Sequence, residues 1–159
     1  MWDGIRVYRV PTPLEIEALS MKAQGYAAQQ ISNRIYPDRG VDRVQARISS
    51  LIAKTGTRKA SQALYQLYRL EILPSPRKEH LIPMLTPREQ IVLGMTTIDG
   101  LTYEEVATKL KLSSKTIGSN MTRIFQVLRS HNQVQALKEA VAHGDLEIKP
   151  PKQLWRGVV

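Results

Sequence analysis

An internal repetition is the feature of this sequence that most constrains its fold. Residues 12–15 read Thr-Pro-Leu-Glu and residues 86–89 read Thr-Pro-Arg-Glu, an offset of 74. Further along, residues 62–64 and 135–137 both read Gln-Ala-Leu, an offset of 73. Because repeated sequence usually means repeated supersecondary structure, we expect two diverged modules, at residues 11–73 and 85–146.

Three other segments flank these modules. Residues 74–84 are interpreted as a linker bounded by prolines, which disfavour helices and sheet ladders. Residues 1–10 are interpreted as an N-terminal arm and residues 147–159 as a C-terminal tail. Each of these ends carries a tryptophan and an arginine. A short strand or an arm along DNA is one interpretation of them, and frayed ends are the other.

Charge and composition narrow the class of protein. Lys and Arg total 23 and Asp and Glu total 14, so the net charge is +9 at pH 7. Such a surface favours nucleic acid or an anionic membrane as a partner. The absence of cysteine excludes disulfides and thiolate zinc sites. Neither a signal peptide nor an apolar run of ~18 residues is present. We therefore expect a cytoplasmic, nucleoid-associated protein without a membrane role.

The second module shows its helices most clearly. Thr86 and Thr102 each open a capping box, as Thr12 does in the first module, which predicts three helix starts. After a tight turn at residues 111–113, Ser113 is placed to cap a third helix. A fourth helix is predicted at about Asn132–His143, ended by Gly144 in a left-handed conformation. The fold class that follows is all-α, with two tandem four-helix helix-turn-helix domains.

The third helix has two distinct faces. Its apolar residues recur at helical spacing and predict a core stripe: Ile117, Met121, Ile124 and Leu128. The opposite face is polar, and in a helix-turn-helix this face lies in the major groove of DNA. Gly118 and Ser119 let the backbone approach base edges, whereas Lys115 and Arg123 reach base edges or phosphates.

This module resembles the LuxR-type, or GerE/NarL-type, helix-turn-helix family. The resemblance rests on residues 85–89, 100–107, 110–113, 115–117 and 136–146, in the right order and at the right spacing. It implies a DNA-binding domain that regulates transcription and usually pairs through its last helix. The DNA-facing positions that it implies are Lys115, Thr116, Gly118, Ser119, Thr122 and Arg123. Gly118, Asn120 and Thr122 depart from the family pattern, which bears on sequence preference but not on docking mode.

The first module resembles the same family in outline only. It keeps residues 11–15, Gly25 and residues 29–32, but its turn is lengthened through residues 36–40. Its recognition-helix equivalent is predicted to begin near Val41. The DNA-binding candidates here are Arg39, Arg43, Gln45, Arg47 and Ser50, and Arg and Gln are the side chains that best read guanine and adenine. The alternative is a degenerate copy that serves as a dimerisation or partner-binding surface.

Helix four of each module carries apolar residues beyond a minimal core. They are Ala63, Leu64, Leu67 and Tyr68 in the first module and Ala136, Leu137 and Ala140 in the second. One interpretation is that the two modules pack against each other through these helices, and an ordinary core helix is the other. If the modules pair, one chain holds two unlike recognition helices about one DNA turn, ~10 base pairs, apart. A monomer is the first expectation and a homodimer the second.

The function predicted from these features is sequence-specific binding of double-stranded DNA in transcriptional regulation. The alternative is a protein-interaction regulator, either an anti-activator or a sigma-like factor that contacts RNA polymerase. RNA binding is disfavoured because Phe125 is the only phenylalanine and stacking aromatics are scarce. An enzyme is not expected, because His80, His131 and His143 are isolated and no phosphate-binding loop is present. No cofactor, metal, receiver domain or small-molecule sensor domain is predicted.

Overall fold

The chain is all-helical in a computed structural model that describes residues 9–38, 40–76 and 82–149. These ranges contain eight α-helices and no strand, which confirms the all-α prediction. The helices are α1 (Pro13–Ala23), α2 (Ala28–Ile35), α3 (Val41–Thr55), α4 (Ala60–Arg69), α5 (Pro87–Thr97), α6 (Tyr103–Leu110), α7 (Ser114–Val127) and α8 (Gln133–His143).

The predicted capping residues set the helix boundaries. The hydroxyls of Thr12 and Thr86 each accept a hydrogen bond from the backbone N–H of the glutamate three residues later, and that glutamate accepts one from the threonine N–H. The intervening prolines stand in the first turn, where a missing N–H has no consequence. At the other end of the chain, Gly144 follows α8 with a φ of 81°, in the left-handed conformation expected for it.

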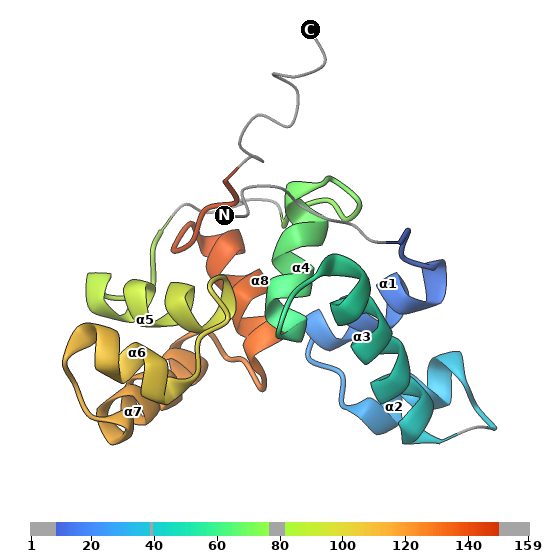
Figure 1. The fold of residues 1–159 in the computed structure, drawn as a ribbon, viewed down its shortest axis with the longest axis horizontal. Helices are drawn as coiled ribbons and strands as arrows, with labels where there is room; N and C mark the ends of the chain where they lie inside the picture. The colour runs from blue at the N-terminus through green and yellow to red at the C-terminus, as the bar shows by residue number, and fades with distance from the viewer. Residues whose placement is uncertain (1–8, 39, 77–81, 150–159) are drawn as a thin grey trace, which may run out of the picture.

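The helices form two groups on either side of a central pair. In Figure 1, α4 and α8 lie at the centre, with α1, α2 and α3 on one side and α5, α6 and α7 on the other. We call α1–α4 the first half and α5–α8 the second half. Helix α8 packs against both α4 and α1, so the two halves are in direct contact.

The core is shared between the halves. The larger apolar cluster contains buried side chains from α1, α3 and α4 together with side chains from every helix of the second half. A smaller cluster belongs to the first half alone and is made of Ala18, Met21, Ile31, Val44 and Ile48. The pair α2–α3 therefore packs mainly on a small core that it forms with α1, whereas the rest of the molecule depends on the shared core.

The predicted boundaries at residues 11–73 and 85–146 stay predictions. Helices α1–α4 fall inside the first range and α5–α8 inside the second. The predicted arms are covered only at residues 9–10 and 147–149, and their other residues lie outside the described ranges, as do residues 77–81 of the linker. None of the helices in the described ranges has the length and apolar content needed to cross a bilayer.

Candidate nucleic-acid interface

A capped, three-residue turn connects α6 to α7. Thr102 caps α6 by accepting from Glu105 N at 3.2 Å. Lys111 then adopts a left-handed conformation with a φ of 57°, and Leu112 N donates to Ala107 O at 2.9 Å. Ser113 caps α7 by accepting from Thr116 N at 3.1 Å. The short helix, tight turn and longer helix predicted from the sequence are confirmed.

Helix α7 presents one buried and one exposed face. Its apolar stripe is almost fully buried: Ile117, Met121, Ile124 and Leu128 are between 0% and 4% exposed. On the opposite face Gly118 is half-buried, and the exposed members of the predicted site are Lys115, Thr116, Ser119, Thr122 and Arg123. The buried stripe therefore turns the polar face toward solvent, as the groove-binding prediction requires.

The centre of the exposed face of α7 carries three residues with short side chains, Gly118, Ser119 and Thr122. A Cβ added at Gly118 would meet no heavy atom within 4 Å, apart from its chain neighbours and the backbone of its own helix. Ser119 Oγ donates to Lys115 O at 3.1 Å, and Thr122 Oγ1 donates to Gly118 O at 3.0 Å. Because both hydroxyls bond back to the helix, they project little and leave the backbone open to a partner surface.

Arg123 is held at the edge of the face by a glutamate of α5. Its Nε donates to Glu89 Oε1 at 2.6 Å, and the side chains are 63% and 5% exposed, respectively. Burial raises the pKa of Glu89, but hydrogen bonds from Thr86 and Arg123 outweigh it and leave the pKa below its ordinary value. The remaining guanidinium N–H groups can still meet a phosphate.

The sequence motif at residues 86–89 pointed to the capping role of Glu89 but not to its ion pair. Nothing in the spacing of residues 89 and 123 signals that contact, because it joins two separate helices. Arg123 is consequently both a structural residue and a candidate DNA contact.

Helix α3 offers the corresponding surface in the first half. Gly40 precedes it with a φ of 72°, and the loop between α2 and α3 spans five residues where its counterpart spans three. Arg43 and Gln45 are exposed, whereas Arg47 and Ser50 are half-buried. The guanidinium of Arg47 lies over the Tyr36 ring at 5.9 Å from its centroid, a cation–π arrangement. Arg39 lies outside the described residues.

The first half also has a buried glutamate paired with a cation. Glu15 is 0% exposed and forms an ion pair with Lys54 near the end of α3. Burial raises the pKa of Glu15, but the hydrogen bonds from Lys54 and Thr12 outweigh it and leave the pKa lowered. In this half the pairing cation lies away from Arg43 and Gln45, so neither of those side chains is engaged by the capping glutamate.

Reciprocal contacts between a glutamine and a glycine hold the two halves together. A Cβ added at Gly100 would lie 2.3 Å from Gln62 Cδ, and one added at Gly25 would lie 2.6 Å from Gln135 Nε2. Both glycines have positive φ angles, 71° and 91° respectively, which disfavour any other residue. The sequence comparison matched Gln62 with Gln135 but did not identify either as a contact between halves.

The residues that precede α4 and α8 make the other pair of reciprocal contacts. Lys59 Nζ donates to Thr96 O at 3.1 Å and to Leu101 O at 2.7 Å. Asn132 Nδ2 donates to Lys22 O at 3.3 Å. Burial lowers the pKa of Lys59, the Arg58 charge lowers it further, and Glu105 partly offsets both. In each half, the residue before the fourth helix therefore donates hydrogen bonds to backbone carbonyls at or just after the end of the first helix of the other half.

The apolar residues predicted to join the halves are buried in the shared core. They are Ala63, Leu64, Leu67, Tyr68, Ala136, Leu137 and Ala140, and none is more than 7% exposed. Burial raises the pKa of Tyr68 above its ordinary value, and the Glu139 charge adds to the effect. In the described ranges no group of three or more His, Asp or Glu side chains is arranged to hold a metal ion.

One known family matches part of the second half. Residues 83–140 match the family described as "Bacterial regulatory proteins, luxR family". Response regulator Rre1 of Synechocystis sp. (strain ATCC 27184 / PCC 6803 / Kazusa) is 28% identical over 117 residues, which cover 65% of this chain and 50% of that protein. The chain thus spans about half the length of that relative. No solved structure matches this chain.

Proposed function

We propose that this chain is a sequence-specific DNA-binding transcriptional regulator that uses two unlike recognition helices, α7 and α3, in adjacent major grooves. The second half carries a LuxR-type helix-turn-helix domain at residues 83–140, and the first half is proposed to be its diverged copy. The observation that carries the proposal is the reciprocal pairing of Gln62 with Gly100 and of Gln135 with Gly25. This pairing supports a fixed relation between the two exposed helix faces.

The arrangement of the molecule supports simultaneous docking. In Figure 1, α7 and the start of α3 lie along the lower edge, on either side of the α4–α8 pair. A net charge of +9 supplies the phosphate affinity that such binding needs. Because the two faces carry different side chains, we expect an asymmetric site rather than a palindrome. Acting on the chromosome, the protein would work in the cytoplasm with the nucleoid.

Selection of bound duplexes from a random pool tests the proposal. The wild-type chain is compared with Arg43→Ala plus Arg47→Ala and with Lys115→Ala plus Arg123→Ala. We expect each double variant to lose preference in a different half of the selected site, at about 1–3 kcal/mol for each base contact removed. Since Arg123 also pairs with Glu89, Lys115→Ala alone serves as the variant that leaves this ion pair intact.

A matched control removes two cations from other helices, Arg88→Ala in α5 and Lys138→Ala in α8. It should leave the selected sequence unchanged. Loss confined to the Lys115 and Arg123 variant would reduce the first half to a structural partner. If the wild-type chain selects no sequence and its duplex binding shows no steep salt dependence, the DNA-binding proposal fails. A protein-interaction role, with RNA polymerase or another regulator, then takes its place.

A further inference from the structure

A pocket lies between the two halves, at one side of their contact. It encloses about 430 Å³ and is lined by the start of α2, the N-terminal part of α3 and the two residues before α8. In Figure 1 the loop before α8 and the loop between α1 and α2 approach each other near the lower centre, where Asn132 Nδ2 donates to Lys22 O at 3.3 Å. The volume falls in the range of roughly 300–1,000 Å³ that small-molecule sites occupy.

Charged side chains occupy the equivalent place at the other side of the contact. At the offset of 73, the two residues before α8 correspond to Arg58 and Lys59, and at the offset of 75 Gln30 corresponds to Glu105. Arg58 pairs with Glu105 at 3.2 Å, and Lys59 Nζ donates to two backbone carbonyls. At the pocket, asparagine replaces the lysine and glutamine replaces the glutamate. These exchanges remove both the long donor and the acid from the pocket side.

The polar rim of the pocket favours an anion. It includes Lys22 and His131 and contains no Asp or Glu. Neither Lys22 nor His131 forms an ion pair within the part of the chain that the structure describes. Gln30 Oε1 already accepts from Ala27 N at 2.8 Å, so the Gln30 amide N–H groups remain as donors. The rim therefore offers a positive charge and N–H donors without a competing carboxylate.

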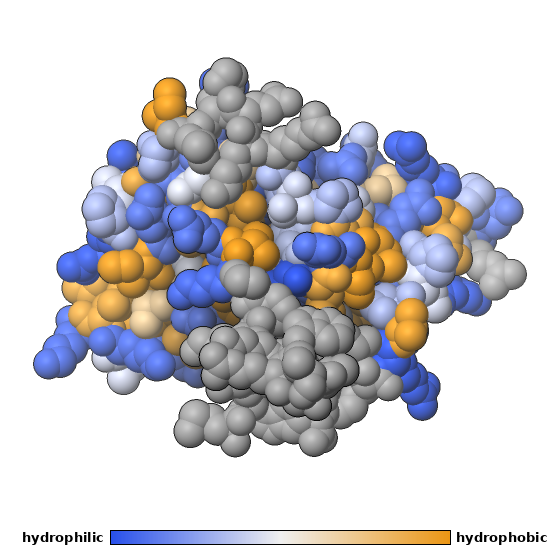
Figure 2. Space-filling model, turned by 90° about the horizontal axis from the view of Figure 1, so that it is seen from above, coloured by the Kyte–Doolittle hydropathy of each residue, from blue (hydrophilic) through white to orange (hydrophobic). Residues whose placement is uncertain are grey.

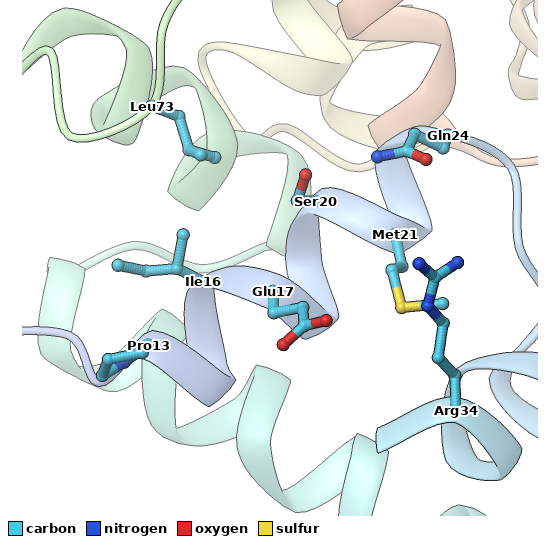
Figure 3. A pocket seen from close by; sticks show the side chains of 8 residues that line it. All are labelled: Pro13, Ile16, Glu17, Ser20, Met21, Gln24, Arg34 and Leu73. Carbon is cyan, nitrogen blue, oxygen red and sulfur yellow. The ribbon is translucent and has the colours of Figure 1, made fainter.

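A second hollow on the first half lacks this selectivity. The groove along α1 encloses about 440 Å³ and is lined by both Glu17 and Arg34 (Figure 3). A carboxylate and a guanidinium in one groove offset each other and select neither sign of charge. Apolar surface does not distinguish the pocket either, because apolar residues also lie among hydrophilic ones on the face seen from above in Figure 2. The absence of acid from its lining is what sets the pocket apart.

The floor of the pocket is apolar. Ile31, Val44 and Ile48 line it, belong to the small core of the first half, and are at most 4% exposed. The ring of Tyr26 also lines the pocket and is partly exposed. Such a floor adds nothing to the binding of a bare phosphate in a DNA backbone, but it can bury the hydrocarbon part of a small molecule. The lining thus fits an organic anion better than it fits a phosphodiester.

We propose that this pocket binds a small organic anion, an aromatic or aliphatic body that carries one acidic group. The acidic group lies against Lys22, Gln30 and His131, and the hydrocarbon body lies on the apolar floor. Gln45 of α3 lines the same pocket. A bound molecule therefore contacts α3 and the segment before α8 together and bridges the two halves. This site goes beyond DNA binding and does not depend on it.

Fluorescence titration with two matched probes tests the proposal. Anilinonaphthalene sulfonate is an apolar anion whose emission rises in an apolar site, and phenylnaphthylamine has the same rings without the sulfonate. We expect the wild-type chain to bind one equivalent of the sulfonate. Its affinity should exceed that for the neutral probe by about ten-fold or more, as one charge-assisted hydrogen bond provides.

Two variants remove the charge selectivity of the pocket. Ala27→Thr plus Gln30→Glu rebuilds in α2 the capping box that Thr102 and Glu105 form in α6, so it should strengthen the helix. Because it places a carboxylate at the rim, it should weaken sulfonate binding by about ten-fold and leave the neutral probe unaffected. Lys22→Met removes the cation and should weaken sulfonate binding similarly.

Lys109→Met is the matched control, because Lys109 stands in the last turn of α6 as Lys22 does in that of α1. It should leave the affinity for the sulfonate unchanged. The proposal is overturned if the wild-type chain binds the sulfonate no more tightly than the neutral probe, or if either pocket variant retains wild-type affinity. It is also overturned if the pocket variants lose affinity for duplex DNA while the wild type binds no sulfonate, which would assign the lining to a DNA phosphate. Failure of sulfonate binding leaves the outcome of the DNA selection unaffected.

Discussion

The two halves place the same backbone hydrogen bonds at corresponding positions. Leu73 N donates to Leu67 O after α4, and Leu146 N donates to Ala140 O after α8, each pair 73 residues apart from the other. Glu71 and Gly144 both adopt positive φ angles there, 58° and 81°. The way each fourth helix ends is thus retained even though only one of these residues is a glycine.

The side chains at the edges of the recognition helices differ instead. The cation that meets the buried capping glutamate is Lys54 in the first half, with 17% of its side chain exposed, and Arg123 in the second, with 63% exposed. Ser50 stands at the position corresponding to Arg123, and Val127 at that of Lys54. A buried carboxylate can therefore be neutralised from either position, which leaves a different outward face for DNA in each half.

The largest expected effect is a loss of unfolding free energy when the shared core is truncated, and it contrasts with truncation of the small core of the first half. Leu137→Ala empties a fully buried site in the shared cluster and should cost about 3–5 kcal/mol of unfolding free energy. Both halves should lose protection from hydrogen exchange together. Ile31→Ala, in the small cluster, should instead reduce protection mainly in α2 and α3. Urea unfolding combined with residue-resolved exchange measures both.

If Leu137→Ala left the exchange protection of the first half unchanged, the halves would be independent domains and the shared core would carry no coupling. If Ile31→Ala reduced protection from hydrogen exchange equally in both halves, the small cluster would be part of the shared core.

The second effect concerns the close approach of the two halves. Gly100→Ala introduces a positive-φ alanine and displaces Gln62, whose Nε2 donates to Ile98 O at 3.2 Å. Conformational strain and lost hydrogen bonds together should cost about 2–3 kcal/mol. The Gln62→Ala background is the control, because it removes the side chain that the added Cβ would meet. In that background Gly100→Ala should cost about 1–2 kcal/mol, from strain alone.

Urea unfolding of Gly100→Ala in the wild-type and Gln62→Ala backgrounds gives the contribution of the contact with Gln62. Equal costs of Gly100→Ala in the two backgrounds would mean that Gln62 contributes nothing to the pairing.

The sequence predicted the parts of this architecture that depend on local chemistry. Thr12, Thr86, Thr102 and Ser113 cap the helices that they were expected to begin, because a cap needs only residues within one turn. The contacts of Lys59 with the second half and of Glu89 with Arg123 were not predicted. They join segments more than 30 residues apart, and no periodicity reports which side chains meet across such a distance. The DNA-facing roles at Lys115 and Arg43 stay predictions, since solvent exposure permits them without testing them.

A smaller expected effect is the pH dependence of stability that the two buried glutamates contribute. The pKa values of Glu89 and Glu15 both lie below the ordinary value of 4.5. Their stabilising contribution is therefore complete above that value and is lost as the pH falls through each folded-state pKa. Glu89→Gln should cost about 1–2 kcal/mol at pH 7 and should lose less stability than the wild type between pH 6 and pH 3. Unfolding in urea across this range measures both quantities.

Glu15→Gln is the counterpart and should cost more at pH 7, because Lys54 is less exposed than Arg123 and is left with a poorer partner. The unfolding free energy of the wild type should decrease faster below pH 4.5 than that of either variant. If it decreases no faster, the two carboxylates contribute no pH dependence.

The smallest effect is expected at the edge of the contact between the halves. Arg58 Nη2 lies 3.2 Å from Glu105 Oε1, but the side chains are 59% and 41% exposed, and exposed pairs contribute little in water and less in salt. Arg58→Ala also retains its backbone N–H for Gln62. It should leave the urea midpoint unchanged. Lys59→Met, one residue along, removes the donor to Thr96 O and Leu101 O and should cost about 1–2 kcal/mol. Equal losses from the two variants would mean that surface charge, not the buried reciprocal contacts, holds the halves together.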